Sequence, residues 1–407
     1  MIKTINGGVT SAKGFKAAGT YVGIKKKRKD MALVYSTVPS YGAGTFTTNV
    51  VKAAPVRWDI ELTKSSQNIQ AVVLNSGVAN ACTGSLGDIN NEKMAKAVAD
   101  QLGIKAEAVY TASTGVIGKH LPIETILNGI PTLVGQLDSS KETGTLAAEA
   151  IMTTDTYSKE CAVSFDLDGI EVIIGGMAKG SGMIHPNMAT MLGVITTDIA
   201  ISKKLLQEAI SENVKETFNM ISVDRDTSTN DSLLILANGL ADNKEITEKN
   251  EAYDLFCQAL NIVTTNLSKQ MAADGEGATK LLEVKVVGTK TKEEAVTLSK
   301  SIITSNLVKT AIFGNDANWG RILCAMGYAG VDFDPDLVDL YVESEYGKLK
   351  LVENGMATQY SEELASKILS AKEVIAKADM KLGEEAATAW GCDLTYDYVK
   401  INADYRS

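Results

Sequence analysis

Short apolar runs rich in β-branched residues recur along this 407-residue chain, and they end at Asn or Gly. Clear examples are residues 69–74, 233–237 and 281–287. Their length and branching predict strands, and the small or polar residues after them predict turns. A chain organised around such runs must form sheets whose apolar faces are covered by other elements.

Amphipathic helical patterns lie between these predicted strands. Residues 91–102 place Met94, Val98 and Leu102 on one face, and Gly103 supplies a stop. Residues 203–218 and 362–378 repeat apolar side chains at near-helical spacing. Strands and helices mix along the whole length, so the sequence predicts an α/β (α+β) fold of layered sheets and helices. At about 100–200 residues per domain, the length predicts two domains, with one large domain as the alternative, and no linker composition marks a boundary.

Composition excludes several classes of partner. The net charge is −10, which argues against nucleic acid as the main ligand. No apolar stretch approaches about 18 residues, so no membrane helix is expected, and the start lacks a secretory apolar core. The five cysteines are odd in number, far apart and without a C-x-x-C, which predicts free thiols and a cytoplasmic location.

The shortage of histidine limits the possible chemistry, because the chain has only His120 and His185. A zinc site needs several convergent ligands, and none of the usual metal, P-loop, dinucleotide or nucleophile-elbow motifs is present. The sequence therefore predicts no cofactor and no metal. A Ser-His-Asp triad would have to use one of the two histidines, and His185 is better explained as a loop residue that orders a turn.

Nucleophilic chemistry without a histidine base remains. A threonine at a newly made N-terminus can use its own α-amino group, whose pKa of about 7.7–8.0 suits a general base. Residues 175–190 lead from a predicted strand at 171–174, through a glycine-rich loop, to an Ala189–Thr190 bond. Thr190 could attack the Ala189 carbonyl in an N-to-O acyl shift. Residues 191–198 would then form a buried strand. From the residues alone, an ordinary glycine-rich turn remains an open alternative.

Residues 179–192, KGSGMIHPNMATML, closely resemble the self-cleavage segment of the glutamate N-acetyltransferase (ornithine acetyltransferase) family of arginine biosynthesis. Further blocks that resemble this family are residues 75–84, 111–118, 153–156, 224–231, 274–280, 315–321 and 401–407. Together they span nearly the whole chain. Ala317 stands where the family pattern favours proline, and Ser407 stands where threonine is also common.

The resemblance implies cleavage between Ala189 and Thr190. It gives an α chain of residues 1–189 and a β chain of residues 190–407 that begins with the nucleophile. Thr190 would attack the acetyl carbonyl of N2-acetyl-L-ornithine and then pass the acetyl group to L-glutamate, a ping-pong reaction. Thr114 and Gly115 match the family's oxyanion-hole donors.

The resemblance also implies substrate contacts, a fold and an assembly. The substrate-binding residues carried over are Thr154, Lys179, Thr190, Glu276, Asn402 and Ser407. Lys179 suits the α-carboxylate that both substrates carry. The family fold is an αββα-type sandwich of the kind also found in self-processing aminopeptidases, and the expected assembly is a heterotetramer of two α and two β chains.

Two alternatives stay open beside the transferase. One is a related self-processed aminopeptidase or amidohydrolase, in which water replaces glutamate. The other is a metabolite-binding module with an intact chain. Some family members also take acetyl from acetyl-CoA, and the sequence does not decide whether this chain is monofunctional or bifunctional.

Overall fold

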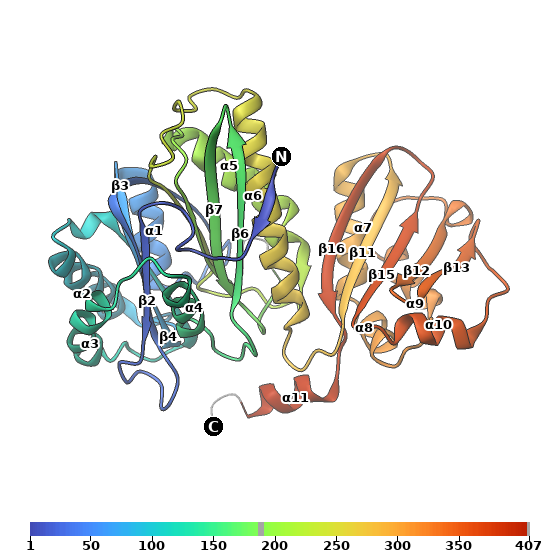
Figure 1. The fold of residues 1–407 in the computed structure, drawn as a ribbon. Coiled ribbons are helices and arrows are strands. Elements are labelled where there is room, and N and C mark those ends of the chain that lie inside the picture. Colours follow the sequence, from blue (N-terminus) through green and yellow to red (C-terminus); the bar gives the residue numbers. More distant parts are fainter. Residues whose placement is uncertain (186–190, 405–407) are drawn as a thin grey trace. The chain divides into compact units, whose positions relative to one another are not determined.

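The computed structural model describes residues 1–185 and 191–404, and these residues form two compact units. In the described part of the chain, the first unit comprises residues 1–180, 191–219 and 226–267. The second comprises residues 181–185, 220–225 and 268–404. Since the chain passes between the units several times, no single linker exists for composition to mark (Figure 1).

The described part of the first unit contains a nine-stranded sheet in the order β1-β6-β7-β8-β10-β3-β4-β5, with β2 paired to β3. Its strands are β1 (Lys3–Ile5), β2 (Phe15–Thr20), β3 (Met31–Phe46), β4 (Ile69–Val78), β5 (Val109–Val116), β6 (Lys159–Leu167), β7 (Ile170–Lys179), β8 (Leu192–Thr197) and β10 (Ser232–Ala237). The long strand β3 pairs with β2 and β4 in its first half and with β10 in its second half. It therefore joins two halves of one sheet.

The two halves of this sheet pack face to face. Val34 and Val72 from the β2–β5 half lie in one buried cluster with Met177, Val194 and Leu234 from the β7–β10 half. Alternate residues of β3 and β4 point the other way, because side chains along a strand alternate between faces. This alternation gives each half an inner face in the core of the sandwich and an outer face for helices.

The helices of this unit pack against the sheet, and one of them contributes Ala147, Ala148 and Ala150 to the buried cluster that joins the two halves. They are α1 (Ala54–Ser65), α2 (Gly84–Leu102), α3 (Ile123–Gly135), α4 (Lys141–Ala150), α5 (Lys203–Glu216) and α6 (Glu251–Ala273). Apolar side chains of α2 and α3 pack on Leu33 and Val73. Across the sandwich, α6 reaches Gly176 of β7, and Gln207 of α5 bonds Gly44 of β3. The layers of this unit confirm the predicted αββα-type sandwich (Figure 1).

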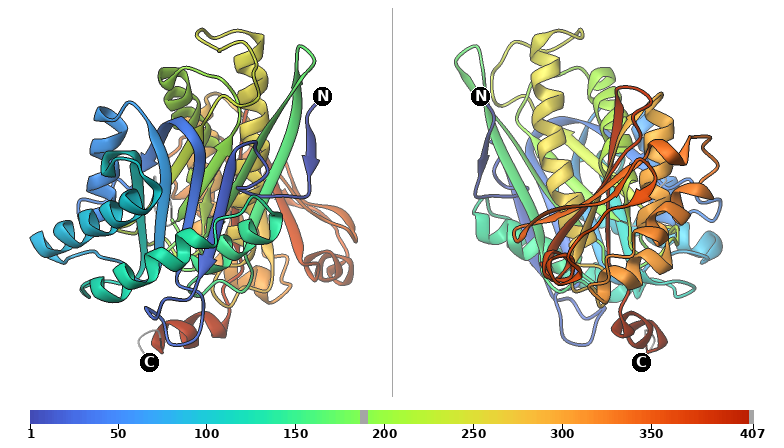
Figure 2. Two further views of the ribbon diagram at one scale, coloured as in Figure 1. Left: turned by 60° about the vertical axis from the view of Figure 1, so that its left-hand side comes forward. Right: turned by 90° about the vertical axis from the view of Figure 1, so that its right-hand side faces the viewer.

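The second unit contains a seven-stranded sheet in the order β14-β13-β12-β15-β11-β16-β9 within its described residues. The strands are β9 (Ile221–Ser222), β11 (Leu281–Thr289), β12 (Asp339–Ser344), β13 (Gly347–Glu353), β14 (Met356–Ala357), β15 (Glu373–Asp379) and β16 (Glu385–Cys392). The helices are α7 (Lys292–Thr304), α8 (Asn306–Phe313), α9 (Trp319–Gly327), α10 (Glu362–Leu369) and α11 (Tyr396–Ala403). Helix α7 packs on β11 and β16, and α10 packs on β12. The right-hand view of Figure 2 shows orange helices along one side of the orange and red strands.

Short 3-10 helices complete the secondary structure of the two units: η1 (Ala106–Ala108), η2 (Phe218–Met220) and η3 (Pro335–Leu337). None of the described helices is both long enough and apolar enough to cross a membrane.

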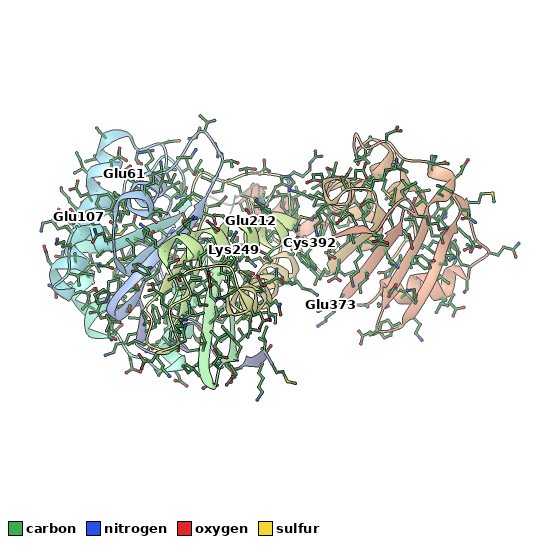
Figure 3. All side chains as sticks on the ribbon, turned by 90° about the horizontal axis from the view of Figure 1, so that it is seen from above. Glu61, Glu107, Glu212, Lys249, Glu373 and Cys392 are labelled. Atoms are coloured by element: carbon green, nitrogen blue, oxygen red, sulfur yellow. The ribbon has the colours of Figure 1, made fainter. Side chains whose placement is uncertain are left out.

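The predicted strands at 69–74, 233–237 and 281–287 are confirmed as parts of β4, β10 and β11. The predicted helix over 362–378 is wrong in its second half. Helix α10 ends at Leu369, and β15 begins at Glu373, which Figure 3 labels. Residues 373–379 alternate between exposed or half-buried and buried positions, the period of a strand, and they pair with β11 and β12.

The predicted glycine-rich loop after residue 174 is also wrong at its start, because β7 continues through Gly175 and Gly176 to Lys179. Both glycines are needed for close packing. A Cβ at Gly175 would lie 2.0 Å from the carbonyl oxygen of Gly8, and one at Gly176 would meet Ile195 at 2.6 Å. A glycine pair in a strand can therefore mark close approach and not a turn.

Candidate active site

Polar residues gather where the parallel strands β4 and β5 end. Asn75 is in register with Ser113, and Ser76 with Thr114. The Ser113 hydroxyl donates to Asn75 Oδ1 at 2.6 Å, and the Asn75 amide donates to the Val78 carbonyl at 2.9 Å. Ligands of α/β proteins commonly bind at the carboxyl ends of parallel strands. The blocks 75–84 and 111–118 therefore meet at an edge suited to binding.

The block 224–231 contributes to the same edge through Asn230. Its side-chain amide donates to the carbonyl of Ala79 at 2.6 Å and to the carbonyl of Ser113 at 2.8 Å. These bonds tie three segments that are far apart in sequence. Since Asn230, Asn75 and Ser113 are all buried, their hydrogen bonds fix the backbone around Thr114.

Gly115 adopts a backbone conformation that other residues rarely take. Its φ is +127°, and a Cβ there would lie 2.4 Å from the carbonyl carbon of Gly77. The ends of β4 and β5 can approach this closely only with glycine at position 115. Thr114 and Gly115, the predicted oxyanion-hole residues, thus lie near the end of β5, where its backbone is held closely against β4.

Asp155 is the centre of a buried ionic cluster beside the end of β5. Its carboxylate lies 2.8 Å from Lys159 Nζ and 3.8 Å from Lys179 Nζ, and it accepts backbone N–H groups of Gly180 at 2.7 Å and Thr153 at 2.9 Å. Burial alone would raise the pKa of Asp155, but the charges of Lys179 and Lys159 outweigh it and hold the pKa well below its usual range. Asp155 is thus ionised at neutral pH and holds two lysines in place.

Lys179 ends β7 and carries its ammonium group to Thr114. Its Nζ donates to Thr153 Oγ1 at 2.9 Å and lies 3.5 Å from Thr114 Oγ1. In the strand register Lys179 is directly opposite Leu192, the first residue of β8. Of the sequence-predicted residues, the structure thus brings Lys179 and Thr114 together.

The other sequence-predicted residues lie elsewhere or outside the described part of the chain. Thr153 contacts Lys179, and Thr154, predicted as a substrate contact, lines a neighbouring pocket. Ala189, Thr190 and Ser407 lie outside the described residues. Thr190 is two positions before Leu192 in the sequence.

The sequence reading did not single out two ionisable groups near this edge. Burial, with smaller contributions from the charges of Lys179 and Arg28, lowers the pKa of Lys25 to about 8 against the opposing charge of Asp30. Burial raises the pKa of Asp231 well above its usual range, although the Met191 N–H donates to its carboxylate. The only signal for Asp231 was its place at the end of the 224–231 block, and Lys25 lay in no block.

The second unit holds a separate polar cluster around Glu276. The side-chain amide of Asn402 donates to Glu276 Oε2 at 2.7 Å, and the backbone N–H of Glu276 donates to the Ser181 carbonyl at 2.9 Å. A Cβ at Gly182 would lie 2.3 Å from the Glu276 carboxylate. Glu276 and Asn402, both predicted as substrate contacts, are thus brought together, and glycine at 182 makes room for them.

His185, also in the second unit, lies 3.1 Å from the Ser222 hydroxyl through Nδ1. Burial, with the charges of Lys300 and Arg225, lowers the pKa of His185 to about 4. The imidazole is therefore neutral at pH 7, and its hydrogen bond joins the 181–185 segment to β9. This arrangement fits the predicted turn-ordering role.

Comparisons with known proteins cover nearly the full length of the chain. Residues 16–407 match the ArgJ family. The chain is 52% identical over 406 residues to the arginine biosynthesis bifunctional protein ArgJ of Caldanaerobacter subterraneus subsp. tengcongensis, with both chains fully covered. It is 50% identical over 396 residues to the protein of the same name from Thermotoga neapolitana, covering 97% of this chain and 99% of that protein.

Solved structures give shorter matches. The ornithine acetyltransferase of Mycobacterium tuberculosis, solved in complex with ornithine, is 40% identical, with 46% of this chain and 99% of that chain covered at a TM-score of 0.43. The family match and the full-length identities to curated relatives lead to one conclusion: this chain belongs to the ArgJ family.

Proposed function

We propose that this chain transfers acetyl from N2-acetyl-L-ornithine to L-glutamate, giving L-ornithine and N-acetyl-L-glutamate, through an acetyl ester on Thr190. Membership of the ArgJ family and the arginine-biosynthesis names of its relatives support an acyltransferase of that pathway. The observation that carries the proposal is the contact of Lys179 with Thr114 at the end of the sandwich, opposite the start of β8.

Self-cleavage between Ala189 and Thr190 makes the nucleophile and divides the chain into residues 1–189 and 190–407. Strand β7 would then belong to the α chain and its partner β8 to the β chain, while β10 of the β chain pairs with β3 of the α chain. Because these backbone ladders do not depend on the cut bond, the two chains remain associated after cleavage.

The first half-reaction breaks the amide of acetylornithine. The Thr190 hydroxyl oxygen bonds to the acetyl carbon while its proton passes to the α-amino group of the same residue. Negative charge then develops on the acetyl oxygen, where Thr114 and Gly115 donate hydrogen bonds. Collapse of this tetrahedral intermediate breaks the C–N bond, the α-ammonium returns its proton to the leaving nitrogen, and ornithine departs.

Glutamate enters next, and its amine attacks the acetyl ester in the reverse sequence of steps. Lys179 suits the α-carboxylate that both substrates carry, because a charge-assisted hydrogen bond to a carboxylate is strong where water is scarce. Glu276 and Asn402 suit the amino group, and Thr154 and Ser407 complete the proposed contacts.

Three finer features belong to the same proposal. The enzyme works in the cytoplasm, and it assembles as two α and two β chains. It also acetylates glutamate from acetyl-CoA, and the word bifunctional in the names of its relatives supports this second activity. The alternative is hydrolysis, in which water takes the acetyl group from the same ester. Product analysis with and without glutamate separates the two reactions.

The test is the intact mass of the purified protein under denaturing conditions, compared between the native chain and Thr190→Ala. We expect two native species that divide at Ala189–Thr190, and one uncut, inactive species for the variant. Turnover by Thr190→Ala would remove Thr190 from the mechanism. Thr114→Ala should still yield the two cleaved chains. Its acetyl transfer should be slower by roughly 10–1000-fold, because an oxyanion donor is lost.

A further inference from the structure

A pocket of about 650 Å³ lies in the first unit beside the Thr153–Asp155 turn. One wall consists of Tyr21 and the basic residues Lys27, Arg28 and Lys29, and the other includes residues 154–158. Pockets of about 300–1,000 Å³ are the usual size for small-molecule sites. The pocket shares Asp155 with the ionic cluster that holds Lys179, so it adjoins the candidate active site.

The basic wall belongs to a loop whose backbone is held in place. The buried carboxylate of Asp30 accepts three backbone N–H groups, from Val22 at 2.7 Å, Gly23 at 3.1 Å and Lys25 at 2.9 Å. The Lys25 ammonium then bridges two carbonyl groups, Lys29 at 3.0 Å and Met152 at 2.6 Å. The loop is therefore fastened to the turn that forms the opposite wall.

The charge of this loop contrasts with that of the whole protein. Residues 25–29 are five consecutive basic residues in a chain of net charge −10. Lys29 pairs with Glu149 at 2.8 Å, and Lys25 points inward, whereas Lys27 and Arg28 are exposed. The other acid of the pocket, Asp155, is already compensated by Lys159 and Lys179. The pocket thus keeps a positive excess at Lys27 and Arg28.

Two tyrosines give the pocket a second kind of recognition. Tyr21 is 51% exposed and Tyr157 is 42% exposed, although both line the pocket. Exposed aromatic rings beside lysine and arginine side chains form the usual arrangement for binding a nucleotide, because bases stack on rings and phosphates pair with cations. Neither an amino acid nor an acetyl group would need both features.

We propose that this pocket binds the phosphorylated adenosine of acetyl-CoA, with the phosphates at Lys27 and Arg28 and the base against Tyr21 or Tyr157. The inference rests on the acetyl-CoA activity in the proposed function and names the surface that would recognise that donor. Its reasons are the position of the pocket next to the Lys179 cluster and the combination of exposed basic side chains with exposed rings. Acetylornithine carries no phosphate, so the basic side chains of Lys27 and Arg28 serve one donor and not the other.

The test compares Lys27→Glu with Lys204→Glu in the processed, full-length protein. Lys204 makes the same charge change on α5, where its side chain is 84% exposed, and it does not line the pocket. Calorimetric titration with coenzyme A, its dephosphorylated form and inorganic pyrophosphate should give the tightest binding for coenzyme A. Lys27→Glu should weaken coenzyme A binding about 10-fold or more, since it replaces attraction to phosphate by repulsion. Lys204→Glu should change it less than about 2-fold.

Kinetics separate this inference from the proposed function. Lys27→Glu should raise the KM for acetyl-CoA about 10-fold or more and leave acetylornithine–glutamate exchange within about 2-fold of the native rate. If coenzyme A bound in a way that depends on Lys27 but acetyl-CoA were not turned over, the pocket would stand as a coenzyme A site. The proposed acetyl-CoA activity would be overturned. No binding by the native protein, equal binding of pyrophosphate and coenzyme A, or an unchanged dissociation constant in Lys27→Glu would each overturn the pocket, whatever the exchange rate.

Tyr21→Ala tests the aromatic part of the site separately. Loss of a stacking ring should weaken coenzyme A binding roughly 5- to 50-fold and leave the affinity for pyrophosphate unchanged. An equal loss of affinity for both ligands, or no loss for coenzyme A, would overturn the assignment of the base to Tyr21. The same titrations with Tyr157→Ala would then test Tyr157.

Discussion

Two clusters in this protein each join one aspartate to two lysines, yet they differ in their access to water. The members are Asp155, Lys159 and Lys179 in the first unit and Asp339, Lys350 and Lys381 in the second. In the Asp155 cluster the side chains are 0%, 0% and 9% exposed. In the Asp339 cluster the aspartate is 7% exposed, but the lysines are 32% and 34% exposed.

Both aspartates are ionised, for related reasons. Burial acts against the charge of Asp339, but hydrogen bonds from Lys381, the Asn354 N–H and Lys350 outweigh it and lower the pKa of Asp339 to about 2. The ionised form of the Asp155 carboxylate is stabilised by the ammonium groups of two lysines that are almost completely buried. Ion pairs between one aspartate and two lysines therefore occur in two different dielectric environments.

The difference indicates what each cluster is for. Removing three charged groups from water costs several kcal/mol per ion, which their attraction seldom recovers, so a buried cluster is poor as a device for stability alone. The Asp155 cluster lies where Lys179 meets Thr114, and its desolvation keeps that ammonium strongly attractive to a carboxylate. The Asp339 cluster lies on β12, β13 and the segment just after β15, where solvent screens it.

The largest expected difference between the clusters follows from removing each aspartate. Asp155→Ala leaves two buried lysines facing each other and should reduce the free energy of unfolding by about 3–5 kcal/mol. Asp339→Ala leaves lysines that can turn to water and should cost no more than about 1 kcal/mol. Urea denaturation of both variants measures this, and equal losses would mean that burial does not distinguish the clusters.

Activity gives the second comparison. Lys179→Met keeps Asp155 paired with Lys159 but removes the ammonium beside Thr114, so KM for both amino-acid substrates should rise roughly 10- to 100-fold. Lys381→Met removes the corresponding lysine of the Asp339 cluster and should leave KM and kcat within about 2-fold. Steady-state exchange between acetylornithine and glutamate measures both. A native KM in Lys179→Met would exclude Lys179 from substrate binding.

The third comparison uses pH, and its sign follows from the lowered pKa. A carboxyl group with a depressed pKa stabilises the folded state above its unfolded pKa, and this contribution is lost as pH falls through the folded pKa. The difference in unfolding free energy between native protein and Asp339→Asn should thus be constant above about pH 4 and vanish towards about pH 2. For Asp155→Asn the loss should also begin below about pH 4 and extend further. Chemical denaturation at stepped pH measures both, and a difference that persists at pH 2 for Asp339→Asn would contradict the assigned cause.

Sequence reasoning found most of the sandwich because its strands carry their own signal. The runs at 69–74 and 233–237 are apolar, β-branched and closed by turn residues, and they form β4 and β10. Residues 362–378 show where such reasoning fails. An apolar spacing that suits a helix continues into Val374, Ala376 and Ala378, where pairing with β11 and β12 selects the strand.

The candidate site divides in the same way. Thr114, Gly115 and Lys179 stand in segments with a distinctive order of residues, so a resemblance could identify them. Asp155 could be placed in a block, but its role depends on two lysines that reach it from β6 and β7. The structure directs Thr153 to Lys179, and no local pattern in the sequence carries that information.

Asp59 of α1 extends the comparison to a buried carboxyl group without a lysine. It accepts the Thr111 N–H at 2.9 Å, and its Oδ2 has no hydrogen-bond partner in the described part of the chain. Burial raises the pKa of Asp59 well above its usual range, against the hydrogen bonds from Thr111. Two lysines keep Asp155 ionised, whereas burial without a lysine keeps Asp59 neutral.

The sign of its pH dependence is therefore opposite. A carboxyl group with a raised pKa contributes fully to stability below its unfolded pKa, and that contribution is lost as pH rises through the folded pKa. Asp59→Asn, which mimics the neutral form, should gain about 1 kcal/mol at pH 7 and lose its advantage below about pH 4. Denaturation at the two pH values measures this small effect. A variant less stable than the native protein at pH 7 would mean that Asp59 is ionised in the fold, and that burial without a lysine does not suffice to keep a carboxyl group neutral here.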